Sequence, residues 1–260
     1  MKTNNLYDNT AFLYDLDNRD IVKADIPFLI EYGEKVSGDI LELACGTGRV
    51  SIELACSLQK NIYAMDLSKT MLERFYIKAE RLPPDAKKRL NILYGDMSQF
   101  SLPQKFGMIF IPFRSFQVLT TEDGASNCLK CVYDHLNDDG IFILHVFKVL
   151  QPYDQSWVGH ISHTYDVVDP VTAKRVRRST ENKTFDIESQ VIQYLTQYRV
   201  NTDEHEEYIE DLVAIKYYYY EQIRNLLDAH GFIVEDEYGY YDKRAVSEGE
   251  EMIFVCSKRI

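Results

Sequence analysis

Short apolar runs alternate with amphipathic segments over the first 150 residues of the chain. The apolar runs, which predict strands, lie at residues 39–44, 61–66, 90–96, 106–113 and 140–147. The segments with helical spacing lie near residues 21–35, 49–59, 69–81 and 122–137. We expect Asp139 and Gly140 to end the last helix, because a glycine commonly follows a helix C-terminus. Alternating strands and helices are typical of a parallel sheet, so we predict an α/β fold.

The pattern changes after residue 150, where polar and apolar residues alternate with a period of two. The segments with this period, which predict antiparallel strands, lie at residues 162–169, 174–182, 184–201 and 206–218. A helix at about 219–231, ended by Gly231, and strands at 232–239 and 250–258 follow. We expect three parts. Residues 1–150 form a core with an N-terminal arm, and residues 216–260 complete this core. Residues 151–215 form an antiparallel insertion, which contributes to a substrate pocket or to an oligomer contact.

Composition narrows the range of partners. Hydrophobic residues make up 45% of the 260 residues and charged residues 27%, which are ordinary values for a globular protein. The net charge of −12 opposes binding to phosphate backbones, so we expect no nucleic-acid partner. The chain has no signal-like N-terminus and no apolar run near the ~18 residues of a membrane helix. We expect a cytoplasmic protein that binds a small molecule, and we leave a homodimer open.

The five cysteines show no spacing typical of a disulfide framework. Cys128 and Cys131 form a C-x-x-C pair in a predicted helix, but neither a second cysteine pair nor a histidine pair accompanies them. A structural zinc site needs four such ligands. We therefore expect reduced thiols and no metal.

The stretch ILELACGTGRVSIELA, residues 40–55, joins the first predicted strand to a helix through Gly46 and Gly48. A glycine turn at this edge of a parallel sheet lets the backbone approach a ligand, and the helix N-terminus offers free N–H groups. Asp66 ends the second predicted strand, where a carboxylate can accept both hydroxyls of a ribose. This pairing predicts a nucleoside site.

Two nucleoside cofactors are compatible with this turn. GTGRVS reads as G-x-G-x-x-S, close to the dinucleotide fingerprint, so a nicotinamide-dependent oxidoreductase stays a distant alternative. Glu42, four residues before Gly46, would oppose a pyrophosphate and suits the ammonium of a methionine-like tail. The residues therefore favour S-adenosylmethionine.

The strings LELACGTGR, AMDLSKTML and LYGDMSQF resemble, in this order, motifs of the class I S-adenosylmethionine-dependent methyltransferases. The resemblance covers about residues 38–150, with Ala44 where the family often has glycine. It implies a Rossmann-like sheet of seven strands, mostly parallel, with an antiparallel last strand. More narrowly, the chain is similar to small-molecule enzymes such as amino-sugar N,N-dimethyltransferases and glycine N-methyltransferases. It implies methyl transfer to a nitrogen or oxygen atom.

The same resemblance assigns the cofactor contacts. Those expected near the methionine portion are Glu42, Ala44, Gly46, Gly48 and Phe113. Those expected near the nucleoside are Asp66 on the ribose, Leu67 on the adenine face, Asp96 on the adenine amino group and the Met97 backbone.

Methyl transfer needs chiefly alignment of the reactants and exclusion of water. We expect His145 as a base, Arg114 as a contact of the substrate or the cofactor, and Tyr14 of the N-terminal arm to converge near the methyl group. The alternatives are structural: His145 bonded to a neighbouring loop, Arg114 paired with an acid, and Tyr14 packed to anchor the arm. Gln117 is a further candidate contact, whereas the basic KRVRR, residues 174–178, predicts a solvated strand face. The rival hypothesis is a protein that senses S-adenosylmethionine without catalysis. A sensor can seal the methyl group, but an enzyme must leave it open to a cavity.

Overall fold

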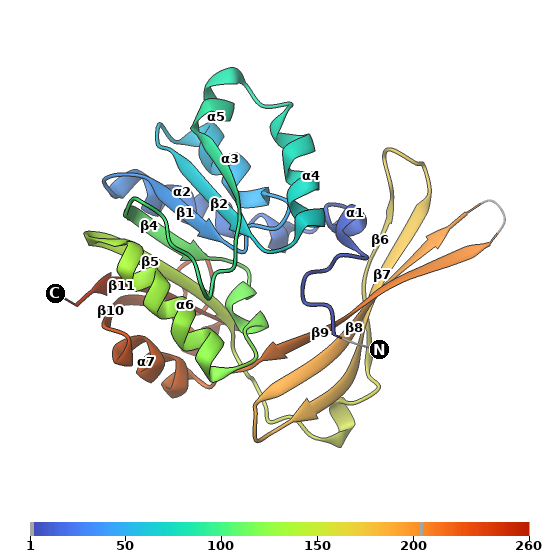
Figure 1. Cartoon of the computed structure of the whole chain (residues 1–260). Coiled ribbons are helices and arrows are strands. Elements are labelled where there is room, and N and C mark those ends of the chain that lie inside the picture. Colours follow the sequence, from blue (N-terminus) through green and yellow to red (C-terminus); the bar gives the residue numbers. More distant parts are fainter. Residues whose placement is uncertain (1–2, 203–204, 260) are drawn as a thin grey trace.

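Two β-sheets organise the chain, which a computed structural model describes over residues 3–202 and 205–259 (Figure 1). The first sheet has seven strands in the order β10-β11-β5-β4-β1-β2-β3, and the second has four in the order β6-β7-β8-β9. The strands of the first sheet are β1 (Ile40–Leu43), β2 (Ile62–Asp66), β3 (Leu90–Tyr94), β4 (Phe106–Ile111), β5 (Leu136–Phe147), β10 (Phe232–Tyr238) and β11 (Glu251–Lys258). Those of the second are β6 (Ile161–Val168), β7 (Arg175–Asp186), β8 (Val191–Asn201) and β9 (Glu206–Lys216).

Helices surround the first sheet and occupy part of the connections. The α-helices are α1 (Ala11–Tyr14), α2 (Asp25–Lys35), α3 (Arg49–Ser57), α4 (Lys69–Ala79), α5 (Pro84–Arg89), α6 (Glu122–His135) and α7 (Tyr220–Ala229). The short 3₁₀ helices are η1 (Asp20–Val22), η2 (Ser115–Val118), η3 (Gln155–Trp157) and η4 (Val246–Glu248). Within the part of the chain that the structure describes, no helix combines the length and hydropathy needed to span a membrane.

The first sheet is parallel apart from its last two strands. β1 pairs with β2 and β4, β4 with β5, and β2 with β3, all in parallel. β11 lies between β5 and β10 and is antiparallel to both. This arrangement confirms the predicted α/β fold with an antiparallel last strand. It places the carboxyl ends of β1, β2, β4 and β5 at one edge.

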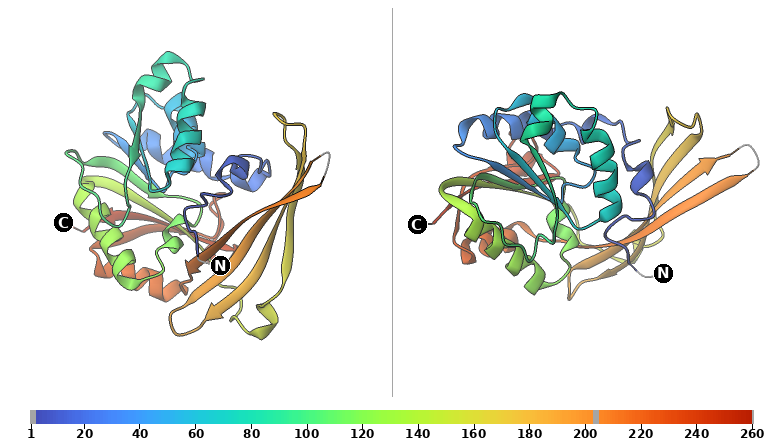
Figure 2. Two further views of the ribbon diagram at one scale, coloured as in Figure 1. Left: turned by 45° about the vertical axis from the view of Figure 1, so that its right-hand side comes forward. Right: turned by 45° about the horizontal axis from the view of Figure 1, so that its top comes forward.

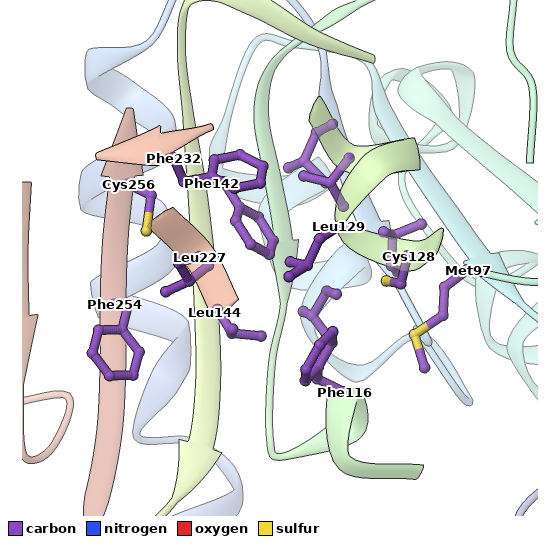
Figure 3. Close-up of a cluster of buried hydrophobic side chains, with 14 of the residues drawn as sticks. Met97, Phe116, Cys128, Leu129, Phe142, Leu144, Leu227, Phe232, Phe254 and Cys256 are labelled. Atoms are coloured by element: carbon purple, nitrogen blue, oxygen red, sulfur yellow. The ribbon is translucent and has the colours of Figure 1, made fainter. Parts of the chain in front are cut away.

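Both faces of the first sheet are buried, because neighbouring residues of each strand point to opposite sides. Ile109 of β4 packs in the cluster beneath α6 and α7, whereas Met108 and Phe110 pack beneath α2 and α3. Figure 3 shows the first cluster, in which Leu129 of α6 and Leu227 of α7 meet strand residues. Four of the five apolar runs therefore became inner strands, and the fifth became β3 at the edge of the sheet.

The predicted end of the helix at residues 122–137 is wrong. α6 ends at His135, and Leu136 already pairs with Phe106 of β4 as the first residue of β5. Gly140 lies within β5, next to a shift in the register of the β4–β5 pairing. A Cβ at Gly140 would lie 3.0 Å from the Phe106 carbonyl oxygen. The glycine therefore allows close approach of two strands and does not end a helix.

The second sheet is the predicted antiparallel insertion, with β6–β7, β7–β8 and β8–β9 paired in succession. It stands beside the first sheet, and the N-terminal arm runs between them (Figures 1 and 2). Gln117 of η2 helps to join the two sheets, because its side chain donates to the Lys216 carbonyl of β9 and accepts from the Phe147 amide of β5. The side chain of Gln117 is fully buried. We expected it as a candidate contact of the substrate or the cofactor, and in the structure it connects β5 to β9.

Asp211 of β9 anchors the arm to the second sheet. Its carboxylate accepts hydrogen bonds from Asn4 Nδ2 (2.7 Å), Asn9 Nδ2 (3.0 Å), Thr10 Oγ1 (2.7 Å) and the Thr10 amide (3.0 Å). Asn5 adds a further link, because it exchanges hydrogen bonds with the backbone of Ala214. Polar contacts thus link the arm to β9, and Asp8 of the arm also accepts from the Ser68 and Thr70 hydroxyls at the start of α4.

Replacing Asp211 with alanine should release the arm. Buried hydrogen bonds to a charged group contribute about 1.5–3 kcal/mol, so Asp211→Ala should lower the free energy of unfolding by about that amount. Limited proteolysis should then cut within residues 3–20 faster than in the wild type. Asp166→Ala, at an exposed ion pair of β6, is the control. Equal cleavage rates in both variants would contradict the anchoring role.

Candidate active site

The turn between β1 and α3 uses its two glycines differently. Gly46 and Gly48 have φ values of +55° and +77°, which a side chain disfavours. A Cβ added at Gly48 would collide with the Phe75 ring, whereas one added at Gly46 would meet nothing within 4 Å. Gly48 therefore permits packing of α3 against α4, and Gly46 borders open space. Ala44 also has a positive φ, +57°, and it stands where the family that the chain resembles often has glycine.

Asp66 at the end of β2 ties two loops together. Its Oδ2 accepts from the Gly46 amide at 2.7 Å, and its Oδ1 accepts from the Ser68 amide at 2.8 Å. Burial raises the pKa of this carboxyl, and the backbone hydrogen bonds lower it in part. Ser68 in turn caps α4 by accepting from the Met71 amide.

A cavity of about 230 Å³, here called the first cavity, lies at this edge of the sheet. The predicted cofactor residues that line it are Ala44, Gly46, Asp66, Leu67, Asp96 and Met97. Residues of the arm and of η2 that line it too are Asn5, Leu6, Tyr7, Tyr14, Ser115 and Val118. The sequence therefore located most of one cavity wall. The assigned contacts of these residues with a cofactor stay predictions.

Three other predicted cofactor residues lie outside the lining of this cavity. Gly48 packs against Phe75, as described above. Glu42 is buried, accepts a hydrogen bond from the Ser51 hydroxyl, and has its pKa raised to about 8 by burial. Phe113 faces a neighbouring cavity, and its amide donates to His145 Nδ1 at 3.0 Å. Their contacts with a cofactor stay predictions.

A second cavity of about 500 Å³ lies between the edge of the first sheet and the second sheet. Tyr7, Tyr14, Ser115 and Val118 line both this cavity and the first one, so the two cavities adjoin each other at these residues. Tyr14, Arg114 and His145, which we expected to converge, all line the second cavity. Their catalytic roles stay predictions.

Glu251 of β11 joins two of these residues. It forms an ion pair with Arg114 through two hydrogen bonds, and its Oε2 lies 2.9 Å from His145 Nε2. His145 Nδ1 accepts from the Phe113 amide and from the Tyr241 hydroxyl at 2.5 Å. Because Nδ1 accepts, Nε2 carries the proton and donates to Glu251. Both ring nitrogens are therefore engaged, and His145 holds the loop after β4 in place.

Tyr14 contacts both cavities from the arm. Its ring packs edge-on against Tyr7, with 6.0 Å between ring centroids, and the Tyr7 hydroxyl lies 3.2 Å from that of Tyr194 on β8. Burial raises the pKa of Tyr14 to about 12, although Arg49 opposes the shift. Tyr14 is therefore a protonated phenol at neutral pH and can serve as a hydrogen-bond donor.

Sequence reasoning missed several residues of the second cavity. These are Glu251, Tyr241, Tyr194 and Arg178. The acid in the apolar run of residues 250–258 was the one local signal for Glu251, because a buried strand seldom carries an unpaired carboxylate. Arg178 belongs to KRVRR, whose other arginines, Arg175 and Arg177, are exposed as predicted.

Comparison with known proteins assigns the core of the chain. The family described as "Methyltransferase domain" matches residues 40–140, which include β1 to β4 and the glycine turn. Residues 40–140 are thus similar to a methyltransferase domain. The match agrees with the predicted resemblance, and a solved structure of similar fold, an amino pentose methyltransferase from Micromonospora echinaspora with a TM-score of 0.71 at 17% identity, contains bound S-adenosylmethionine.

Two curated relatives match part of this chain. Putative methyltransferase YqeM of Bacillus subtilis is 30% identical over 131 residues, which cover 49% of this chain and 51% of the relative. The second relative is a dTDP-3-amino-3,6-dideoxy-alpha-D-glucopyranose N,N-dimethyltransferase of Streptomyces fradiae. It is 29% identical over 140 residues, which cover 52% of this chain and 51% of the relative. The match thus spans about half of the length of each relative.

A solved structure resembles the whole chain. An S-adenosylmethionine-dependent methyltransferase from Clostridium acetobutylicum superposes with a TM-score of 0.77 at 23% identity, covering 97% of this chain and 98% of the other. This likeness shows that the two proteins share a fold, the second sheet included.

Alanine at the two glycines of the turn between β1 and α3 should affect different properties. Gly48→Ala should lower the free energy of unfolding by about 2–4 kcal/mol, because it adds a collision with Phe75 to the cost of a positive φ. Gly46→Ala should cost only about 1 kcal/mol of stability. It should lower the affinity for S-adenosylmethionine at least tenfold, because the methyl group of the new alanine would enter open space at the first cavity. Chemical denaturation and calorimetry measure the two effects. Normal cofactor affinity in Gly46→Ala would refute this assignment of the cavity.

Glu42 should make the stability of the protein depend on pH. Its folded-state pKa of about 8 exceeds the ordinary value of 4.5, so the folded chain holds an extra proton between these values. The stability that this proton provides is complete below pH 4.5 and is lost as the pH rises towards 8. Glu42→Gln removes the ionisation, so its stability relative to wild type should rise with pH, by up to about 1.4 kcal/mol per unit. Glu53→Gln, an exposed change on α3, is the control. A difference that is constant with pH would show that Glu42 titrates normally.

Proposed function

We propose that this protein transfers a methyl group from S-adenosylmethionine to an atom of a small molecule held in the second cavity. One observation carries the proposal: the first cavity adjoins a larger one through the shared residues Tyr7, Tyr14, Ser115 and Val118. An enzyme needs such a second space for the acceptor, whereas a sensor can close around the methyl group. The arrangement therefore favours catalysis.

The residues of the first cavity fit the cofactor of the family. Gly46 leaves room for close approach, because a Cβ there would meet nothing. Asp66 offers a carboxylate for ribose hydroxyls, and Leu67 and Met97 offer apolar surface for a base. When bound, the cofactor supplies a methyl group attached to a positively charged sulfur. This chain's own contribution is to position the acceptor beside it and to exclude water.

Nitrogen is the acceptor atom that the geometry supports best. A hydroxyl needs a base to remove its proton, but both ring nitrogens of His145 are engaged and Tyr14 stays protonated. A neutral amine has its own lone pair and can attack without a base. The name of one curated relative, an N,N-dimethyltransferase of an amino sugar, agrees with an amine acceptor.

A labelled-methyl assay tests the proposal. The protein is incubated with S-adenosylmethionine labelled at the methyl group, together with panels of small amines and small alcohols. We expect label in an amine product and release of the demethylated cofactor. Binding without transfer to any acceptor, including a metabolite extract, would indicate a sensor. Binding of NAD with hydride transfer would indicate the oxidoreductase.

Asp66→Ala should weaken the cofactor in the same preparation. Loss of a charged acceptor costs about 1.5–3 kcal/mol, a factor of roughly 10–150 in affinity. Because Asp66 also accepts from the Gly46 and Ser68 amides, thermal unfolding must be measured beside calorimetry. Asp85→Ala, at an exposed position of α5, is the control. Unchanged affinity in Asp66→Ala would remove Asp66 from the cofactor site.

A further inference from the structure

Arg178 of β7 is the basic residue of the second cavity that has no acidic partner among residues 3–202 and 205–259. Its Nη1 donates to the Thr164 hydroxyl at 3.2 Å, and its guanidinium carbon lies 5.8 Å from the centre of the Tyr198 ring. Both of these groups are neutral. The nearby carboxylate, Asp17, already pairs with Arg19: burial raises the pKa of Asp17, whereas Arg19 and, to a lesser extent, Arg178 lower it. No carboxylate of the described residues lies within ion-pair distance of Arg178.

The other arginines at this cavity are neutralised. Arg19 pairs with Asp17, and Arg114 pairs with Glu251. On the outer side of β7, Arg177 pairs with Asp166, so successive residues of one strand differ in environment. A charge partly removed from water without a counterion is costly, and a bound anion offsets that cost.

The charge of the cavity differs from that of the whole chain. Arg19, Arg114 and Arg178 line it together with a single acid, Glu251. The chain as a whole carries 41 acidic and 29 basic residues. Neutral hydrogen-bonding side chains that also line the cavity are Tyr194, Thr180 and Asn182. Because Asp17 and Glu251 neutralise Arg19 and Arg114, Arg178 leaves this wall with one positive charge in excess, which can attract an anion.

We propose that Arg178 binds an oxyanion, a carboxylate or a phosphate, on the acceptor. This inference rests on the proposed function and names the substrate class: a small amine that also carries a negative charge. Arginine suits this role because its planar donors match two oxygens of a carboxylate or phosphate. Binding the anion on the second sheet would leave the amine free to reach the first cavity.

The single tryptophan of the chain provides a direct readout. Trp157 lines the second cavity, so its fluorescence reports occupancy without any methyl transfer. The full chain, saturated with the demethylated cofactor, is titrated separately with inorganic phosphate, pyrophosphate and acetate. We expect a saturable change with at least one probe, and the order of their affinities separates a phosphate from a carboxylate.

Variants on the two sides of β7 provide a matched pair. Arg178→Gln should weaken the best probe tenfold or more, and Arg178→Lys, which keeps the charge, should lose less. Arg177→Gln should change probe affinity less than twofold, because its side chain pairs outside the cavity. Thermal unfolding establishes that each variant is folded. Equal probe affinity in wild type and Arg178→Gln, or no saturable change with any probe, would overturn the inference.

The assay of methyl transfer keeps the two proposals separate. Arg178-dependent probe binding without any transfer would preserve the anion site and refute the enzyme. Transfer to neutral amines at equal rates in wild type and Arg178→Gln would preserve the enzyme and refute the anion site. Faster transfer to anionic amines than to neutral ones, lost in Arg178→Gln, is the expected result.

Discussion

The carboxylate of Asp211 is the contact on which the arrangement of both cavities depends. It accepts hydrogen bonds from Asn4, Asn9 and Thr10, and so holds the N-terminal arm against β9. The same arm supplies Tyr7 and Tyr14 to both cavities. Because a buried carboxylate is stable only when its oxygens are satisfied, the arm and the second sheet form as a unit. The walls of the site therefore come from a long-range polar contact as well as from the core of the first sheet.

Several buried charged groups among residues 3–202 and 205–259 follow one pattern, from which Arg178 departs. Asp66 and Asp211 accept backbone amides, while Asp25 and Glu251 neutralise Arg49 and Arg114. In each case a neighbour compensates for the loss of water. The second cavity keeps one arginine that pairs with no acid of these residues, which suggests that its partner arrives with the ligand. This connects the electrostatics of the fold to the chemistry of the acceptor.

Most of the first sheet could be predicted, because its strands are apolar on both faces and each is followed by a recognisable helix or turn. The glycine turn and Asp66 were found for the same reason: their roles depend on local spacing. The end of α6 was not predicted correctly. Residues 137–139 carry polar side chains near the start of a strand, and Gly140 looked like a helix end. Its actual use, close approach to Phe106, depends on a neighbouring strand that local sequence does not specify.

The sequence by itself determined the fold class, the family resemblance of residues 40–140 and much of the first cavity, because these follow from short-range patterns. Only the tertiary structure decided the second cavity, whose walls come from the arm, η2, β7, β8 and β11. Arg177 and Arg178 show the reason. Because side chains alternate along a strand, the two arginines point to opposite faces of the second sheet. The elements that pack against the sheet decide which of these faces borders the cavity. Long-range contacts set that choice, and they turned one arginine of a basic run into part of a binding cavity.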